Sequence, residues 1–146
     1  MNKLNNKELL DLLKTDVKSF NDYRIQFFDQ IINFSNANLA GANLAGAYLK
    51  RADLERADLK GTNLERANLE KANLVKANLV GADLSRACLC KANLKGANLL
   101  EANLYDANLE GANLHDAQIT LTKENLEAIL KARRIWKWKK KYILKI

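Results

Sequence analysis

The sequence predicts an all-β solenoid core in which the chain turns one corner per repeat, with helical segments at both ends. Three observations predict this class. Leucine occupies every fifth position from Leu39 to Leu114, and Ile119 continues the series. Alanine stands two positions before each of these residues, with Thr62 as the single exception. Asn or Asp lies between them in fourteen of the seventeen units.

A five-residue period fits neither a continuous helix nor a continuous strand. At about 100° per residue, successive leucines would lie about 140° apart around a helix and would form no stripe. In one long strand an odd period would send alternate leucines to opposite faces. The pattern works if Ala and Leu point inward from a short extended segment, Asn or Asp points outward, and the remaining two residues form a corner. Coils built in this way stack about 4.8 Å apart and pair their backbone groups with the coils above and below.

The repeated unit is A(D/N)LXX, as in ANLEKANLVKANLVGADL over residues 67–84. It resembles the pentapeptide repeat family over residues 37–121, or 32–121 if a degenerate unit with Ile32 and Phe34 is included. The resemblance implies a right-handed quadrilateral β-helix of about four coils, with four repeats per coil, over residues 34–121. Gly41, Gly61 and Gly81 lie twenty residues apart, as expected if they share one corner of such a coil.

A stack of coils has two open ends that expose apolar core and unpaired backbone edges. We expect residues 1–33 to form an N-terminal helical cap. Residues 6–14 carry leucines with the pattern of a short amphipathic helix. Residues 16–32 place Val17, Phe20, Phe27 and Ile31 at near-helical spacing after Asp16, a candidate N-cap.

Residues 122–146 are predicted to be a C-terminal helical cap followed by a basic aromatic tail. Thr122 is a candidate N-cap, and Leu126, Ile129 and Leu130 define the apolar face of a helix over residues 123–134. Beyond this helix, the segment IWKWKKKYILKI is compatible with either more helix or a strand.

The net charge of +7 is concentrated in this C-terminal segment. Residues 1–36 carry five basic and five acidic side chains, residues 37–121 carry ten of each, and residues 122–146 carry nine basic and two acidic. The tail residues that could contact a partner are Arg133, Arg134, Trp136, Lys137, Trp138, Lys139, Lys140, Lys141 and Tyr142. Basic groups mixed with aromatic rings suit an anionic membrane or nucleic acid. The alternative is a cap whose aromatic rings bury against the coil end while the lysines stay solvated.

Stacking at a period of twenty aligns basic residues into three candidate surface columns. They are Arg51, Lys71 and Lys91; Arg66 and Arg86; and Arg56 and Lys76. Acidic residues gather further along the chain, at Glu101, Asp106, Glu110 and Asp116. These columns suggest a binding face, and a solvated surface of alternating charge is the competing interpretation.

The sequence contains no recognisable catalytic constellation, and no cofactor or metal is expected. His115, the only histidine, stands beside Asp116 and is interpreted as a solvated residue. Cys88 and Cys90 are too few for a zinc site and are interpreted as reduced thiols, because a disulfide would close a strained three-residue loop. The N-terminus does not have the pattern of a secretory signal, so a cytoplasmic location is the default expectation.

The sequence therefore predicts a non-enzymatic structural or protein-interaction module. One alternative is binding of a membrane or nucleic acid through the tail. Another comes from members of the resembled family that mimic DNA and modulate type II topoisomerases. Such mimicry requires an acidic rod, and the balanced charge of residues 37–121 disfavours it.

Overall fold

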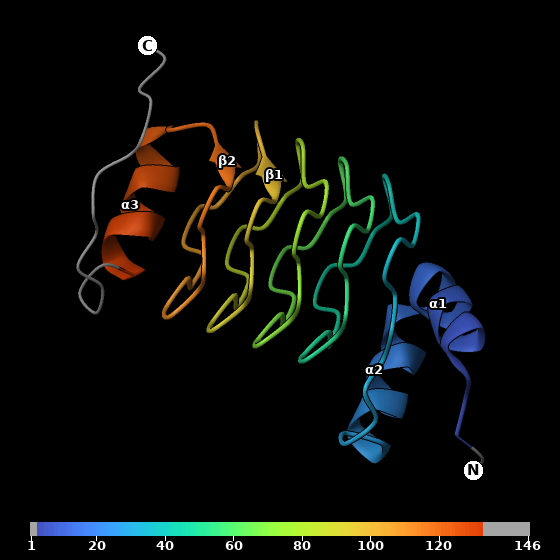
Figure 1. Cartoon of the computed structure of the whole chain (residues 1–146). Coiled ribbons are helices and arrows are strands. Elements are labelled where there is room, and N and C mark those ends of the chain that lie inside the picture. Colours follow the sequence, from blue (N-terminus) through green and yellow to red (C-terminus); the bar gives the residue numbers. More distant parts are fainter. Residues whose placement is uncertain (1–2, 133–146) are drawn as a thin grey trace.

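The computed structural model describes residues 3–132 of the chain. Helices α1 (Asn6–Thr15) and α2 (Val17–Gln26) come first, and α3 (Lys123–Ala132) comes last. Between them the chain winds through stacked coils, in which only β1 (Asn98–Leu99) and β2 (Gln118–Ile119) extend to two-residue strands. Figure 1 shows the stack with α1 and α2 at one end and α3 at the other.

Every pairing between coils is parallel and joins residues twenty positions apart. The isolated bridges begin with Asn33 and Asp53 and continue to Asn93 and Asn113, and β1 pairs with β2 in the same register. One turn of the coil therefore takes four five-residue units. The predicted alignment of Gly41, Gly61 and Gly81 is confirmed, since the N–H groups of Gly41 and Gly61 donate to the carbonyls of Lys60 and Val80 in the next coil.

The inward assignment of leucine and alanine is also confirmed. The leucines at every fifth position from Leu39 to Leu114 are all buried, and so are the alanines from Ala47 to Ala107, whereas Leu100, at a corner, is 40% exposed. The single exception to alanine is explained by a hydrogen bond, because the fully buried Thr62 hydroxyl donates to the carbonyl of Leu39 at 2.8 Å. Burial of a leucine side chain contributes roughly 2 kcal/mol, so the leucine columns dominate the stability of the stack.

The corners share one backbone conformation. The second residue after Phe34 and after each core leucine has a positive φ between 54° and 68°, at every fifth position from Asn36 to Asp116. The next N–H closes the turn onto the leucine carbonyl, as in the bond from Ala52 to Leu49 at 3.0 Å. These features describe a type II turn, which favours Gly or Asn at that position. Only six of the seventeen corners have glycine, so the other eleven residues adopt the left-handed region.

The Asn and Asp residues between Ala and Leu form a second set of local bonds. In most units the side-chain oxygen accepts the N–H two residues later, as Asn68 does from Glu70 at 3.0 Å. This bond is an Asx turn, which holds the start of the corner. Some of these side chains also bond between coils. The Nδ2 group of Asn73 donates to Oδ1 of Asp53 at 3.0 Å, and Asn78 donates in the same way to Asp58 at 2.9 Å.

The N-terminal helices begin where the sequence predicts, but α2 is shorter than expected. The predicted N-cap of α2 is confirmed, since Asp16 accepts the N–H of Ser19 at 3.0 Å. The extension of this helix to residue 32 is wrong. The helix ends at Gln26 because the chain must turn to bring Ile32 into the first coil, where its carbonyl accepts the N–H of Asp53. Ile31, assigned to the apolar helix face, is instead 67% exposed.

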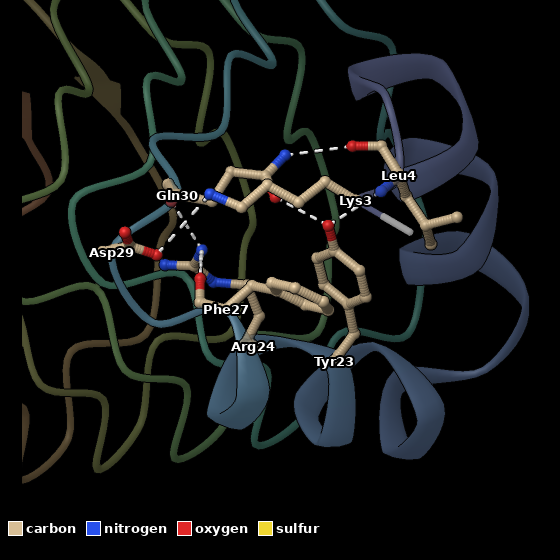
Figure 2. A network of polar contacts seen from close by, with 7 residues as sticks. All are labelled: Lys3, Leu4, Tyr23, Arg24, Phe27, Asp29 and Gln30. Carbon is tan, nitrogen blue, oxygen red and sulfur yellow. Dashed lines mark hydrogen bonds and ion pairs between the residues drawn. The ribbon is translucent and has the colours of Figure 1, made fainter. Parts of the chain in front are cut away.

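Arg24 joins α2 to the coils through main-chain carbonyls, and Figure 2 shows its contacts with Phe27 and Gln30 in the turn after α2. Its buried guanidinium donates to the carbonyls of Phe27 and Gln30, at 3.4 and 2.7 Å, and of Tyr48 and Lys50, at 3.3 and 3.1 Å. Burial lowers the pKa of Arg24. Because the two carbonyl pairs belong to different segments, one side chain holds the turn after α2 against the coil.

At the opposite end, α3 presents a different face to the coil from the one expected. Thr122 acts as predicted, with its hydroxyl accepting the N–H of Asn125 at 3.2 Å. Asn125 and Ala128 are the buried residues, whereas Leu126 and Leu130 are 39% and 50% exposed. The predicted apolar face is therefore only partly correct. Hydrogen bonds from Asn125 decide the orientation, because its side chain bonds to the N–H of Leu104 and to the carbonyls of Ala102 and Thr120. Among residues 3–132, no helix has the length and apolar character needed to cross a membrane.

Candidate functional surfaces

The basic residues of the three predicted columns all occupy corners. Each is exposed and each has a positive φ, from 55° at Arg56 to 61° at Arg51. Since the coils pair with a period of twenty, Arg51, Lys71 and Lys91 stack on one corner, Arg66 and Arg86 on a second, and Arg56 and Lys76 on a third. The structure thus places each column as a row of positive charge along the outside of the stack.

Glutamates beside the columns pair with some of these charges. Glu65 lies 3.7 Å from Arg66 and 3.4 Å from Arg86 in the next coil. Glu70 bonds to Lys50 at 2.7 Å and lies 3.7 Å from Lys71. The bond with Lys50 is the main cause that lowers the pKa of Glu70. These pairs neutralise part of the positive charge of the columns. As exposed ion pairs, they contribute little to the stability of the fold.

Three of the seven column residues form no ion pair within residues 3–132. They are Arg51, Lys76 and Lys91. Arg51 and Lys91 belong to the same corner, on either side of the paired Lys71. This corner therefore presents two cations that have no carboxylate within 4.0 Å among residues 3–132, on a backbone bonded to the next coil.

The acidic side chains of the later coils lie near α3. Asp106 pairs with Lys131 of this helix at 3.2 Å. A groove of about 430 Å³ runs beside this pair, and Ala107, Leu109, Ala128 and Glu110 contribute to its walls. Among residues 3–132, its ionisable lining side chains are Asp106, Glu110 and Lys131, and its lining includes no cysteine, histidine or serine.

His115 and Asp116 are in contact, with 2.7 Å between Nδ1 and Oδ2. Both side chains are more than two-thirds exposed, which agrees with the interpretation of solvated residues. Catalytic use of such a pair requires a nucleophile held against the imidazole, and no bond from a third side chain reaches it within the described part of the chain. Residues 3–132 contain no cluster of three or more side chains able to bind a metal ion.

The nine predicted contact residues of the tail, Arg133 to Tyr142, lie outside the described residues. The structure also places on the surface three apolar side chains whose exposure the sequence did not predict. Ile25, Phe28 and Ile31, around the turn after α2, are 61%, 78% and 67% exposed. Of these three, only Ile31 belongs to the near-helical spacing that predicted burial, and no residue in this stretch signals where the helix ends.

The comparisons with known proteins agree with the geometry of the coils. The model of the pentapeptide repeats matches with eight copies, over residues 32–70, 57–96 and 87–123. The matched span of residues 32–123 makes up 92 of the 146 residues. No curated protein sequence matches the chain.

Several solved structures are similar. A pentapeptide repeat protein from the cyanobacterium Cyanothece 51142 is 38% identical, with a TM-score of 0.45, over 62% of this chain and 56% of that one. HetL from Nostoc sp. strain PCC 7120, involved in heterocyst differentiation regulation, is 41% identical, with a TM-score of 0.37, over 60% and 38%. QnrB1, a plasmid-mediated fluoroquinolone resistance protein, is 20% identical, with a TM-score of 0.34, over 62% and 61%.

The match spans 56% and 38% of the lengths of the first two structures. The family match, the five-residue unit and the twenty-residue pairing register lead to one assignment. The chain belongs to the pentapeptide repeat family, whose members form right-handed quadrilateral β-helices.

Proposed function

We propose that the chain is a non-enzymatic module that binds another protein through the corners of its coils. One observation carries this proposal: the column of Arg51, Lys71 and Lys91 keeps two cations without an ion pair in the described residues, on a backbone fixed by bonds to the next coil. A preorganised row of charge costs little conformational entropy when a partner binds. The matching partner surface is a row of carboxylates on a protein.

In this proposal the three segments have separate tasks. Residues 34–121 form the binding stack of about four coils, and residues 1–33 and 122–146 cover its ends. Support for the covering role comes from the bonds of Arg24 and Asn125 to carbonyls of the terminal coils. Covered ends would prevent further strands from adding to the open edges, which favours a discrete particle over a filament. We place the protein in the cytoplasm on the sequence argument given above.

The first experiment asks which part of the full chain binds. Tagged wild-type protein and a full-length tail variant with glutamine at Lys137, Lys139, Lys140 and Lys141 are used to capture proteins from the native cell. We expect the same protein to be enriched by both, and its release by moderate salt, since charge pairs between exposed surfaces are screened. Enrichment that disappears in the tail variant would overturn the assignment to the coils.

The second candidate function is anionic-surface binding by the tail. It is favoured by the charge distribution, because the excess of seven positive charges lies in residues 122–146 while the other two segments are balanced. Wild-type and tail-variant proteins are compared for sedimentation with phosphatidylserine vesicles and for retention on duplex DNA, over a range of salt. Binding lost only by the variant would support this function, and equal binding by the two proteins would remove it.

A DNA-mimic role stays the least favoured alternative. Residues 37–121 carry equal numbers of acidic and basic side chains, and the acidic ones include Glu65 and Glu70, which are engaged by neighbouring cations. A DNA mimic requires a continuous negative surface. This alternative is tested by adding the protein to a gyrase supercoiling assay. We expect the supercoiling activity of gyrase and its sensitivity to drugs to be unchanged.

A further inference from the structure

The two cysteines of the chain meet on the surface of one coil. Cys88 occupies the position between Ala and Leu, and Cys90 is the first residue of the following corner. Their Sγ atoms are 2.9 Å apart, in hydrogen-bond contact, and both residues are partly buried. The chain contains no other cysteine, so any chemistry of this pair is confined to one site.

The conformation of the coil brings the two Sγ atoms together. In the coils on either side, the residues aligned with Cys88 are Asn68 and Asn108. Each folds its side chain back onto the N–H of the residue two positions later, at 3.0 Å. Cys88 replaces such an asparagine, and its side chain meets the side chain two positions later instead. The geometry that produces an Asx turn elsewhere therefore brings two thiols together here.

The backbone around the pair is held by the preceding coil. The N–H of Cys88 donates to the carbonyl of Ala67, and the carbonyls of Cys88 and Cys90 accept from Leu69 and Lys71. Two residues of extended chain separate their Cα atoms by about 6.6 Å, inside the range that a disulfide spans. Formation of an S–S bond of about 2.05 Å requires the sulfur atoms to approach by about 0.9 Å. The bond closes the three-residue loop that is expected from the sequence to be strained, and the short separation already present offsets part of that strain.

We propose that Cys88 and Cys90 form a dithiol site that closes to an intramolecular disulfide on reaction with a small-molecule disulfide such as oxidised glutathione. The thiolate of Cys88 attacks one sulfur of oxidised glutathione and releases one glutathione thiolate. The thiolate of Cys90 then attacks Sγ of Cys88 and releases the second. The protein loses two protons and two electrons, and oxidised glutathione is reduced to two molecules of glutathione.

The surroundings assign the order of these steps. Burial, the adjoining Cys88 thiol and the charge of Glu110 raise the pKa of Cys90 to about 12. Cys90 is therefore a poor first nucleophile at neutral pH, because the thiolate is the attacking species. Once Cys88 is held in a mixed disulfide, its thiol no longer raises the pKa of Cys90, and the remaining causes are burial and the charge of Glu110. Cys88 is the attacking thiol, and Cys90 is the resolving one.

Intact-mass spectrometry of the full chain tests the site. Reduced wild-type protein, Cys88→Ser and Cys90→Ser are incubated with excess oxidised glutathione at pH 8 and quenched with acid. We expect wild type to lose the mass of two hydrogens and to retain no glutathione. Cys90→Ser should retain one glutathione, and Cys88→Ser should react at least tenfold more slowly. Circular dichroism spectra that match wild type verify that both variants are folded.

Three results would overturn the proposal. Retention of glutathione by the wild-type protein would show that Cys90 does not resolve the mixed disulfide. An unchanged wild-type mass would show that the site does not react. Equal rates for the two single variants would contradict the assigned order. As a second measurement, peptide mapping of the oxidised wild-type protein should place the S–S bond within one peptide; a bond between two chains would contradict the intramolecular closure.

Discussion

The hydroxyl of Thr62 donates a 2.8 Å hydrogen bond to the main-chain carbonyl of Leu39 inside the core. Thr62 is the one residue that interrupts the alanine column, and it is fully buried without an unsatisfied polar atom. The carbonyl of Leu39 also accepts the N–H of Ala42 at 3.1 Å. A polar side chain is therefore compatible with this core because a main-chain acceptor lies within its reach.

We predict that Thr62→Val lowers the free energy of unfolding by about 1 kcal/mol. The shape is retained and the hydrogen bond is lost, but the Leu39 carbonyl keeps its bond from Ala42. Urea denaturation measures the change, and Thr62→Ser, which retains the hydroxyl, should preserve the bond. A Val variant as stable as wild type would show that this bond contributes nothing.

Leu79 is fully buried in the middle of the stack, where a charge has no partner. We predict that Leu79→Lys yields insoluble protein or a large loss in melting temperature, since a buried unpaired ammonium costs several kcal/mol. Leu79→Met, which conserves volume, serves as the control and should cost less than about 1.5 kcal/mol. A normal melting curve for the lysine variant would contradict the inward placement of the leucines.

Gly61 isolates the backbone requirement of the corners. Its φ is +61°, and a Cβ built there meets no atom within 4 Å. We therefore predict that Gly61→Val is destabilised by about 2 kcal/mol through backbone strain alone, while Gly61→Asn loses about half as much. Thermal unfolding compares the two variants, with Lys60→Val as the neighbouring control. Equal stabilities of the Val and Asn variants would be inconsistent with a left-handed corner.

Arg24 tests the attachment of the N-terminal helices. Replacement by methionine removes the donors to the carbonyls of Gln30, Tyr48 and Lys50, and we expect a loss of about 3 kcal/mol. Amide hydrogen exchange should show the largest loss of protection around α2 and the first coil. The control is Arg51→Met, at an exposed position, which we expect to change stability by less than about 0.5 kcal/mol. If Arg24→Met left protection unchanged, the helices would not depend on this side chain.

The repeat region could be predicted from sequence because its period is regular over seventeen units. The backbone conformation of the corners could not be predicted, because residue type does not indicate it. Arg51, Lys71 and Glu101 have a positive φ, as Gly61 does. Stacking hydrogen bonds impose that conformation on residues that do not favour it. The role of Asn and Asp was missed for a related reason, because the pattern indicates which way they point but not that they bond the N–H two residues later.

The end helices show where hydrophobic spacing alone misleads. Phe27 and Ile31 continue the spacing of α2, but the chain turns at Gln26 to enter the first coil. In α3 the leucines suggested the buried face, yet Asn125 lies against the coil because it satisfies backbone groups of Leu104 and Ala102. Periodicity reports apolar positions and carries no information on such tertiary hydrogen bonds.

The central claim is that a corner column of the coils contacts a protein partner. It is tested most directly by charge reversal in Arg51→Glu/Lys91→Glu, compared with Lys60→Glu/Lys95→Glu as a control with the same charge change on other corners. Glu101 shows that glutamate is compatible with the corner backbone. In quantitative capture from the native cell, we predict that the first variant captures at least tenfold less of the enriched partner than wild type does. The control variant should capture as much as wild type. Equal capture by both variants would contradict the claim.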